Sequence, residues 1–490
     1  MFLPLSPLVI PLLTAIACLF ARASRPTQHL VAILGAFVGA LACGALFLEV
    51  WSTGRIVVSM SDWPAPFGIV VVVDTLSAVL TSTTALVHLA ITSHGLASAD
   101  EDRRRSDFWP LVNTLVMGVQ GAFLTGDLFN LYVWFEVLLI SSFVLVALGN
   151  SRLQIEAAAK YVVLNLLSSG AFLIGIALIY GTTGTLNLAD LSESVRGPDA
   201  PRLLASISVL FAIGYGIKAA MVPFSGWLPS AYGSPPATLA ALLAGLLTKV
   251  GVYAFLRVGT LLFLDNVPGF ESAILLCALI TLVVGALGAF AQVKLRGVIV
   301  HTVVFAVGFM LLGIGTGTRD GLAAAIFYLV SDMVVVTTLL LLGGEVERIT
   351  GRRDLAGMGG LYRSHPALAL GFLVVALSVA GFPPFVGFWG KVALFEAAVS
   401  HGDWSGMLVA LFGSAIVLSS VGQAWSLGLW SSAEHTAADP RMEPGRVLPL
   451  VGLVGLILAF SLWPAPLFEV AQRAATELTD LEGYREAVLP

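Results

Sequence analysis

Four ionisable side chains lie in otherwise apolar stretches of this chain and could carry protons. Glu136 is part of LTGDLFNLYVWFEVLLISSFVLVALG, and Lys218, Lys249 and Lys391 are surrounded by aliphatic, aromatic and glycine residues. A charged group in hydrocarbon is costly unless it is paired or neutralised, so such residues usually mark an ion path. Lysine can lose its proton when it is desolvated, whereas arginine effectively cannot. The four residues therefore indicate a proton path, with Lys218 as the counter-charge of Glu136 if their helices touch.

Other polar residues in or beside the apolar stretches have weaker claims. Asp332 lies deep in IFYLVSDMVVVTTLLLLGG and is either a path residue or a polar contact between helices. His301 opens an apolar segment and is either a relay or a satisfied polar residue. Asp74 and Asp127 fall near expected helix ends, which favours a capping role. The lysines also have a structural explanation, since long cationic side chains near helix ends can reach the lipid headgroups.

The elements that must position these groups are membrane-spanning helices. The chain has 490 residues, is 58% hydrophobic and 11% charged, and has a mean hydropathy of +0.94. Soluble proteins are about 25% charged, and an apolar run of about 20 residues spans a bilayer as a helix. Fourteen such segments are predicted, the first being a retained helix rather than a cleaved signal: roughly 2–20, 30–50, 68–91, 108–125, 129–149, 159–181, 203–228, 236–257, 273–292, 298–317, 321–344, 366–400, 406–429 and 447–466.

Basic residues predict the orientation of the bundle. The odd-numbered loops hold fifteen Lys and Arg residues, and the even-numbered loops with the C-terminal tail hold seven, including Arg257 at the expected end of the eighth span. Basic loops face the cytoplasm, so the odd-numbered loops are expected there and both termini on the other side. The count leaves three lysines, and no arginine, inside the spans.

The seventh and twelfth spans are interrupted by proline and glycine. They read GYGIKAAMVPFSGWLPSAYGSPP and SVAGFPPFVGFWGKVALF, and each carries one buried lysine. Paired broken helices suggest internal repeats and point to a transport site. The predicted units are residues 1–107 (three helices), 108–257 (spans 4–8), 273–429 (spans 9–13) and 430–490 (the last helix and tail).

The sequence carries no motif for catalysis, cofactors or metals. A P-loop, GxSxG, HExxH or strand-associated GxGxxG is absent, so a transporter subunit is expected rather than an enzyme. Cys18, Cys43 and Cys277 are far apart and form no ligand cluster. The small net charge of −5 gives no indication of nucleic acid as a partner.

The segments DLFNLYVWFEVLLISSFVL and IKAAMVPFSGWLPSAYGSPPATLAALLAGLLTKVGVYA are long and specific. Along nearly its whole length the chain resembles the antiporter-like subunits of respiratory complex I, membrane-bound hydrogenases and Mrp-type cation/proton antiporters. Within them it is most similar to the D subunits of Mrp antiporters.

The resemblance implies an all-α integral membrane fold of about fourteen helices, with two inverted five-helix repeats and broken helices 7 and 12. It also implies a hydrated path through Glu136, Lys218, Lys249 and Lys391. It further implies a bacterial inner-membrane complex with other Mrp subunits that exchanges Na⁺ or K⁺ for protons.

One region departs from the family pattern. Relatives commonly carry a histidine and a lysine in the eleventh span, where this chain has Ser331 and Val336. The central relay is therefore either rerouted through Asp332, His301 and water, or broken. Two alternatives remain: a proton-pumping subunit of a redox-driven complex, and a scaffold subunit with a vestigial path.

Overall fold

The computed structural model describes residues 2–60, 63–97, 107–196, 202–431 and 443–489, and these ranges are mostly helical. The helices of the first half are η1 (Leu3–Leu5), α1 (Ser6–Phe20), η2 (Ala21–Ala23), α2 (Arg25–Thr53), α3 (Thr75–Leu96), α4 (Phe108–Leu124), α5 (Leu128–Ala147), α6 (Arg152–Thr183), α7 (Leu188–Ser194), α8 (Leu204–Ala219), η5 (Phe224–Trp227), α9 (Leu228–Gly233), α10 (Ala237–Ala254) and η6 (Phe255–Phe263). The second half contains α11 (Phe270–Phe290), α12 (Leu295–Gly315), α13 (Arg319–Thr350), η7 (Leu355–Gly357), α14 (Leu361–Ser364), α15 (Pro366–Ala380), α16 (Val386–Ser400), α17 (Trp404–Trp425), η8 (Ser426–Trp430), α18 (Pro444–Leu462), α19 (Ala465–Thr479) and α20 (Leu481–Val488). The strands β1 (Ile56–Ser59) and β2 (Val70–Val73) pair antiparallel, with Ile56 opposite Val73.

Most helices are long and apolar enough to cross a membrane, which confirms the predicted all-α membrane fold. Among the described residues, twelve helical segments meet this description. Two shorter apolar helices, α4 and α15, coincide with the other two predicted spans. The exact number of fourteen spans stays a prediction, as does the division of the chain into 1–107, 108–257, 273–429 and 430–490.

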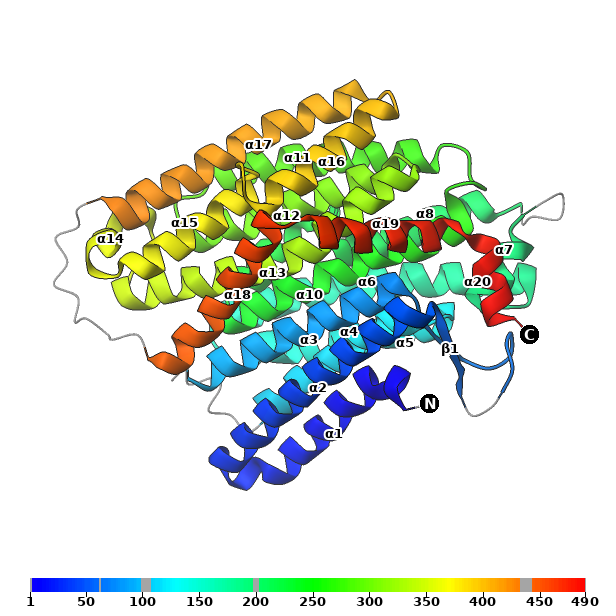
Figure 1. Ribbon diagram of the computed structural model, residues 1–490, viewed down its shortest axis with the longest axis horizontal. Helices are drawn as coiled ribbons and strands as arrows, with labels where there is room; N and C mark the ends of the chain where they lie inside the picture. The colour runs from blue at the N-terminus through cyan, green and yellow to red at the C-terminus, as the bar shows by residue number, and fades with distance from the viewer. Residues whose placement is uncertain (1, 61–62, 98–106, 197–201, 432–442, 490) are drawn as a thin grey trace.

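The helices run along one common direction, so the bundle has two ends (Figure 1). Loops 148–151, 234–236, 291–294 and 351–360 lie at one end, together with the last turn of α3 and the first turn of α18. We call this the basic end, because it holds most of the loop arginines. The β-hairpin, α7, α20 and both chain termini lie toward the opposite end, which we call the terminal end. The described parts of the fifth, seventh, ninth and eleventh loops therefore lie at the same end, while the side of the membrane that this end faces stays a prediction.

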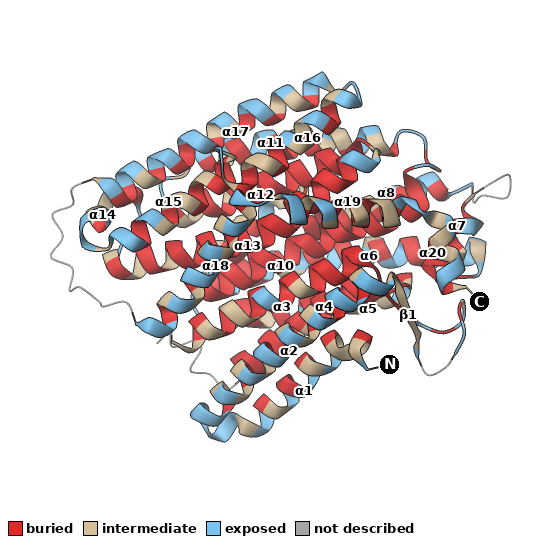
Figure 2. Ribbon diagram, viewed as in Figure 1, coloured by how far each residue is buried: buried red, intermediate tan, exposed pale blue. Residues whose placement is uncertain are grey.

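The centre of the bundle is formed by α10 and α13 (Figure 2). The most apolar stretch of each is 100% buried, whereas the corresponding stretches of α2 and α18 are 22% and 28% buried. A helix that is apolar all round must be buried in protein or lipid. Peripheral α2 exposes Leu30, Leu34 and Leu41, as expected of a face that contacts lipid.

Two helices are broken at the positions that the sequence predicts. The α8 helix is followed by its C-cap Ala220 and α15 by its C-cap Gly381, both in the left-handed conformation with φ of 60° and 80°. Prolines follow each break, because proline has no backbone donor with which to continue a helix. The indole of Trp227 donates to the Ile217 carbonyl, and that of Trp389 to the Ser461 carbonyl, each at 2.9 Å. Freed backbone thus lies against protein, as membrane depth requires.

The eighth predicted span does not end at Arg257. The helix continues as the π-helix η6, and Arg257 is only 2% exposed within it. Its assignment to a loop, and the inference that lysines alone are buried in the spans, were wrong. A charge near the end of an apolar run is read as a boundary, but here a buried partner allows the run to continue past it.

Candidate functional site

Lys249 and Asp332 form an ion pair at the centre of the bundle. Nζ of Lys249 lies 2.7 Å from Oδ2 of Asp332, and the two side chains are 0% and 7% exposed. Lys249 also donates to the Ala244 carbonyl of its own helix at 2.9 Å. The pair joins α10 to α13, the two most enclosed helices. Asp332 was expected to be either a path residue or a polar contact between helices. In the structure it lies directly against Lys249, one of the predicted path lysines.

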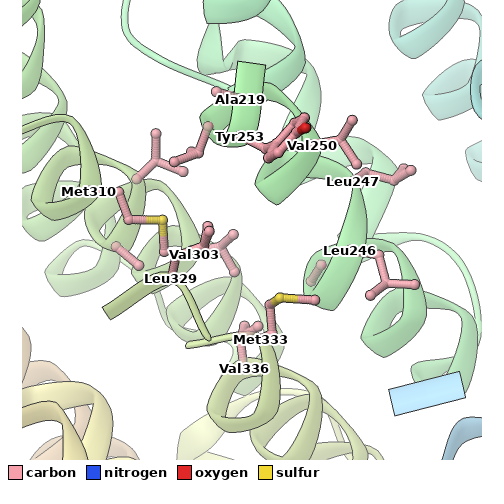
Figure 3. Close-up of a cluster of buried hydrophobic side chains, with 14 of the residues drawn as sticks. Ala219, Leu246, Leu247, Val250, Tyr253, Val303, Met310, Leu329, Met333 and Val336 are labelled. Atoms are coloured by element: carbon pink, nitrogen blue, oxygen red, sulfur yellow. The ribbon is translucent and has the colours of Figure 1, made fainter. Parts of the chain in front are cut away.

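An apolar cluster lies beside this pair. Leu246, Leu247 and Val250 of α10 gather with Met333 and Val336 of α13 around one centre of packing (Figure 3). Side chains from α12, including Val303 and Met310, complete it. Charge in such surroundings interacts strongly, because the local dielectric is low. The cluster also leaves Asp332 as the acidic group closest to Lys249.

Lys218 and Glu136 do not form the expected contact. The Glu136 carboxylate accepts a hydrogen bond from the Ser169 hydroxyl of α6, which lies between α5 and α8. Nζ of Lys218 has no hydrogen-bond partner among the described residues and lies 5.6 Å from the centre of the Phe135 ring. Lys218 and Glu136 therefore do not form a direct ion pair in the described structure.

Lys391 lies at the break between α15 and α16. Its Nζ donates to the carbonyls of Val379 and Ala380 at 3.0 and 2.8 Å. These acceptors are free because α15 ends there. The ammonium group also lies 5.0 and 4.9 Å from the ring centres of Phe305 and Phe309 of α12, in the range of cation–π contacts. The break therefore creates the binding site for this lysine.

Tyr328 lies between the Lys249–Asp332 pair and Lys391, a role the sequence did not suggest. It precedes Asp332 by one turn of α13. Its ring contacts Gly390, the residue before Lys391, where an added Cβ would come within 2.9 Å of the ring. In the sequence, the hydroxyl of Tyr328 among apolar residues of a helix was the one feature that could have pointed to this position.

His301 is placed away from the central pair. Nδ1 of its ring faces the Gly297 carbonyl at 2.8 Å, and the ring lies against Gly288 of α11. It lines a pocket at the basic end with Lys294 and Arg296. Within the described part of the chain, no hydrogen bond or ion pair joins His301 to Lys249 or Asp332. His301 thus lies at the basic end rather than at the centre of the bundle, and its relay role stays a prediction.

A second buried ion pair, between Arg257 and Asp74, lies near the terminal end. Nη2 of Arg257 is 2.6 Å from Oδ2 of Asp74 and 3.3 Å from Oγ of Ser77. Asp74 is the N-cap of α3, accepting from the Ser77 amide, so its predicted capping role is confirmed. Its complete burial was not expected. Helix α19 covers this end, where Glu477 accepts from the Thr75 amide at 2.8 Å.

A polar pocket opens at the basic end. It has a volume of about 780 Å³ and is lined by the ends of α3, α10, α13 and α18. Glu345 on its wall is paired with Arg446 at 3.2 Å and Arg348 at 2.8 Å, and lies 3.4 Å from Nε2 of His94. Nδ1 of His94 is 3.1 Å from the Thr238 hydroxyl. His94 of α3 thus forms part of the pocket wall, where it is hydrogen-bonded to Thr238 at the start of α10.

The described residues contain no group of three or more His, Cys, Asp or Glu side chains that could hold a metal ion. The polar centres are instead a line of single lysines and carboxylates set in apolar packing.

Comparison with known proteins shows the family to which the chain belongs. The family described as NADH:quinone oxidoreductase/Mrp antiporter, TM, matches residues 125–417. The chain belongs to this family. It is 36% identical to the D subunit of the Na⁺/H⁺ antiporter of Bacillus subtilis over 487 residues, covering 99% of this chain and 98% of that one.

Two solved structures share the whole fold of this chain. A chain of the Mrp complex from a Dietzia species superposes with a TM-score of 0.92 at 30% identity, covering all of both chains. A chain of the archaeal membrane-bound sulfane sulfur reductase superposes with a TM-score of 0.93 at 24% identity over the same extent. The latter likeness concerns the fold alone.

Ser331 and Val336, the two positions expected to depart from the family pattern, are both buried in α13. The Ser331 hydroxyl donates to the Tyr328 carbonyl of its own helix at 3.0 Å. Val336 is part of the apolar cluster beside Lys249. Neither residue offers a group that could take over a charge, so Asp332 is the ionisable side chain that α13 presents at this depth.

Proposed function

We propose that this chain is the proton-translocating subunit of a multi-subunit antiporter that exchanges Na⁺ or K⁺ for protons. It would be a transporter subunit rather than an enzyme. The observation that carries the proposal is the Lys249–Asp332 ion pair, at 2.7 Å between two helices whose cores are fully buried. The full-length similarity to the D subunit of a Na⁺/H⁺ antiporter supports the same function.

The proposed path runs from Glu136 and Lys218, through Lys249 and Asp332, to Lys391. Each step changes the charge of one group and thereby the proton affinity of the next, because charges act over long distances where the dielectric is low. Protonation of Asp332 would release Lys249 from its ion pair. Tyr328 lies in the interval to Lys391 and would bridge it, with water, in place of the eleventh-span residues of relatives.

The chain would work in a bacterial inner membrane with the other subunits of an Mrp-type complex. The Dietzia structure that it matches is of such a complex. The basic end would face the cytoplasm, because basic loops are retained there. Both termini would then lie outside. The lysine path would need lipid and partner subunits around it, which fits the apolar outer surfaces of α2 and α6.

The deciding experiment is cation-dependent proton flux in vesicles that contain the assembled complex. Asp332→Asn keeps the size of the side chain and removes its charge, and should abolish Na⁺- or K⁺-driven proton movement. The matched control is Lys160→Met, which breaks the 2.8 Å pair with Glu156 on the exposed surface of α6. Flux at the level of the native complex in Asp332→Asn, with all subunits present, would contradict the proposal.

Two alternatives are separated by related measurements. A scaffold role is favoured by the apolar cluster next to Lys249, and it predicts that neither Asp332→Asn nor Lys391→Ala changes flux. A redox-driven pump would co-purify with quinone- or hydrogen-reacting subunits. The companions of the purified chain decide this second question directly.

A further inference from the structure

Helix α3 carries a polar face along almost its whole length, although it lies within the bundle. Ser77, Thr81, Thr84, His88 and Thr92 form this polar face of α3, and all five are buried. Their spacing of three or four residues places them on one side of a helix. Nothing in the path through Glu136, Lys218, Lys249 and Lys391 uses this helix.

Three side chains on the polar face are buried without a protein partner. Among the described residues, Oγ1 of Thr84, Nε2 of His88 and Oγ1 of Thr92 make no hydrogen bond. By contrast, the hydroxyl of neighbouring Thr83, which lies off this face, donates to the Val79 carbonyl at 2.7 Å. Burying a polar atom without a partner is costly, and such atoms are normally satisfied by internal water.

The polar face meets α4 and the continuous helix of α10 and η6: the Ser77 hydroxyl donates to the Phe123 carbonyl of α4 at 2.6 Å, and both ends of α3 contact the helix of α10 and η6. Near the terminal end, Arg257 contacts Asp74 and Ser77. At the basic end, Thr238 lies against Gly95 and 3.1 Å from Nδ1 of His94. The order of these end contacts makes the two helices antiparallel.

This antiparallel arrangement brings the polar face to the depth of Lys249. Thr84 lies midway between the two contacts on α3, and positions 247 and 248 lie midway on α10. Lys249 follows Thr238 by about three helical turns, so the two share a face of α10. The Oγ1 atom of Thr248 is also buried without a hydrogen bond in the described structure. Unsatisfied polar atoms thus extend from the basic-end pocket to the central ion pair.

We propose that the polar face of α3 lines a water-filled half-channel that carries protons between the basic-end pocket and Lys249. Its mouth is formed by His94 and Thr238, which line the pocket. Toward the terminal end it is closed by the Arg257–Asp74 pair, since a fixed guanidinium repels protons and cations. The half-channel adds a route outside the two predicted repeats. That protons are the transported ion rests on the proposed function, whereas the presence of water along α3 does not.

Hydration is tested with Ag⁺, an ion small enough to follow a file of water and reactive toward thiols. Thr84→Cys, Thr92→Cys and Thr83→Cys are made in a chain whose Cys18, Cys43 and Cys277 are replaced by alanine. Complexes in sealed vesicles of either orientation are exposed to Ag⁺, denatured, and labelled with a fluorescent maleimide. We expect the thiols at 84 and 92 to be protected at least tenfold faster than the thiol at 83, and only from the basic-end side.

Protection at 84 and 92 no faster than at 83, or equal from both sides, overturns the half-channel. If Thr84→Cys does not assemble with its partners, Thr92→Cys carries the same comparison. The transport arm compares Thr84→Val with Thr83→Val: we expect Thr84→Val to slow proton flux about fivefold, the effect of losing one hydrogen-bonding group, and Thr83→Val to leave it unchanged. Equal flux in the two variants also overturns the route. Ag⁺ protection in a complex without cation-dependent flux instead contradicts the proposed function alone.

Discussion

The Lys249 ammonium and the Asp332 carboxylate lie 2.7 Å apart although 83 positions separate them in the chain, and they bind α10 to α13 where both are closed to solvent. A buried pair of this kind is unfavourable to form and more unfavourable to break, because either charge alone is stranded in a low dielectric. Such a pair could serve proton transfer, because moving one proton from Lys249 to Asp332 would neutralise both groups.

Removing one partner of this pair should destabilise the chain more than removing both. Asp332→Leu alone leaves Lys249 buried without a counter-charge, at a cost of about 3–5 kcal/mol, whereas Lys249→Met with Asp332→Leu should be nearly neutral. Thermal unfolding of the purified complex checks this as a double-mutant cycle. Additive losses in the double variant would show that the two charges are not coupled.

Lys391→Arg should abolish proton flux while the complex still assembles. Arginine keeps its positive charge under all physiological conditions, so the position could no longer release a proton. The control is Lys160→Arg on the exposed face of α6, which should have full activity. Flux is measured with a pH-sensitive dye in vesicles. Normal flux in Lys391→Arg would exclude proton release from this site.

Ser169→Ala should reduce flux more than Ser168→Ala. The Ser169 hydroxyl donates to the Glu136 carboxylate, whereas the Ser168 hydroxyl donates to the Gly214 carbonyl of α8 at 2.7 Å. Losing a hydrogen bond to a charged group costs about 1.5–3 kcal/mol, roughly twice the effect of a neutral one. We expect Ser168→Ala to lower the unfolding temperature only. The reverse ranking in flux would show that Ser169 does not tune Glu136.

Arg257→Met should destabilise the terminal end strongly, because it leaves Asp74 buried and unpaired at a cost of about 3–5 kcal/mol. Arg485→Ala is the matched control, since its pair with Glu193 is largely exposed and such pairs contribute about 1 kcal/mol or less. Unfolding temperatures of the two variants are compared in detergent. Equal losses would mean that burial of Arg257 is unimportant. The double change Arg257→Met with Asp74→Asn should recover most of the loss.

The sequence predicted correctly the features that depend on one continuous segment, such as helix breaks and apolar helices. Lys391 and Lys218 stand beside proline-glycine interruptions, and both breaks occur as expected. Long apolar runs likewise predict the helices, with boundaries shifted where a helix continues into a loop, as α13 does to Thr350.

Pairing between distant helices could not be read in the same way. Glu136 bonds to Ser169 of α6 instead of Lys218, and the sequence does not show that α6 packs against both α5 and α8. Asp332 could be chosen as the partner of Lys249 only once α10 and α13 were known to touch. Arg257 was misplaced because its partner, Asp74, lies in another apolar segment. In each case the missing information is a helix neighbour, not a residue type.

The Arg257–Asp74 closure has an electrical consequence. If water reaches Lys249 from the basic end only, that end and the ion pair are close to the same potential, and most of the membrane voltage falls across the dry terminal half. One elementary charge crossing 100 mV gains or loses about 2.3 kcal/mol. A proton would then reach the Lys249–Asp332 pair with little electrical work. The membrane voltage would act mainly on its further transfer toward the terminal end. The chain would sense membrane potential without any dedicated voltage-sensing helix.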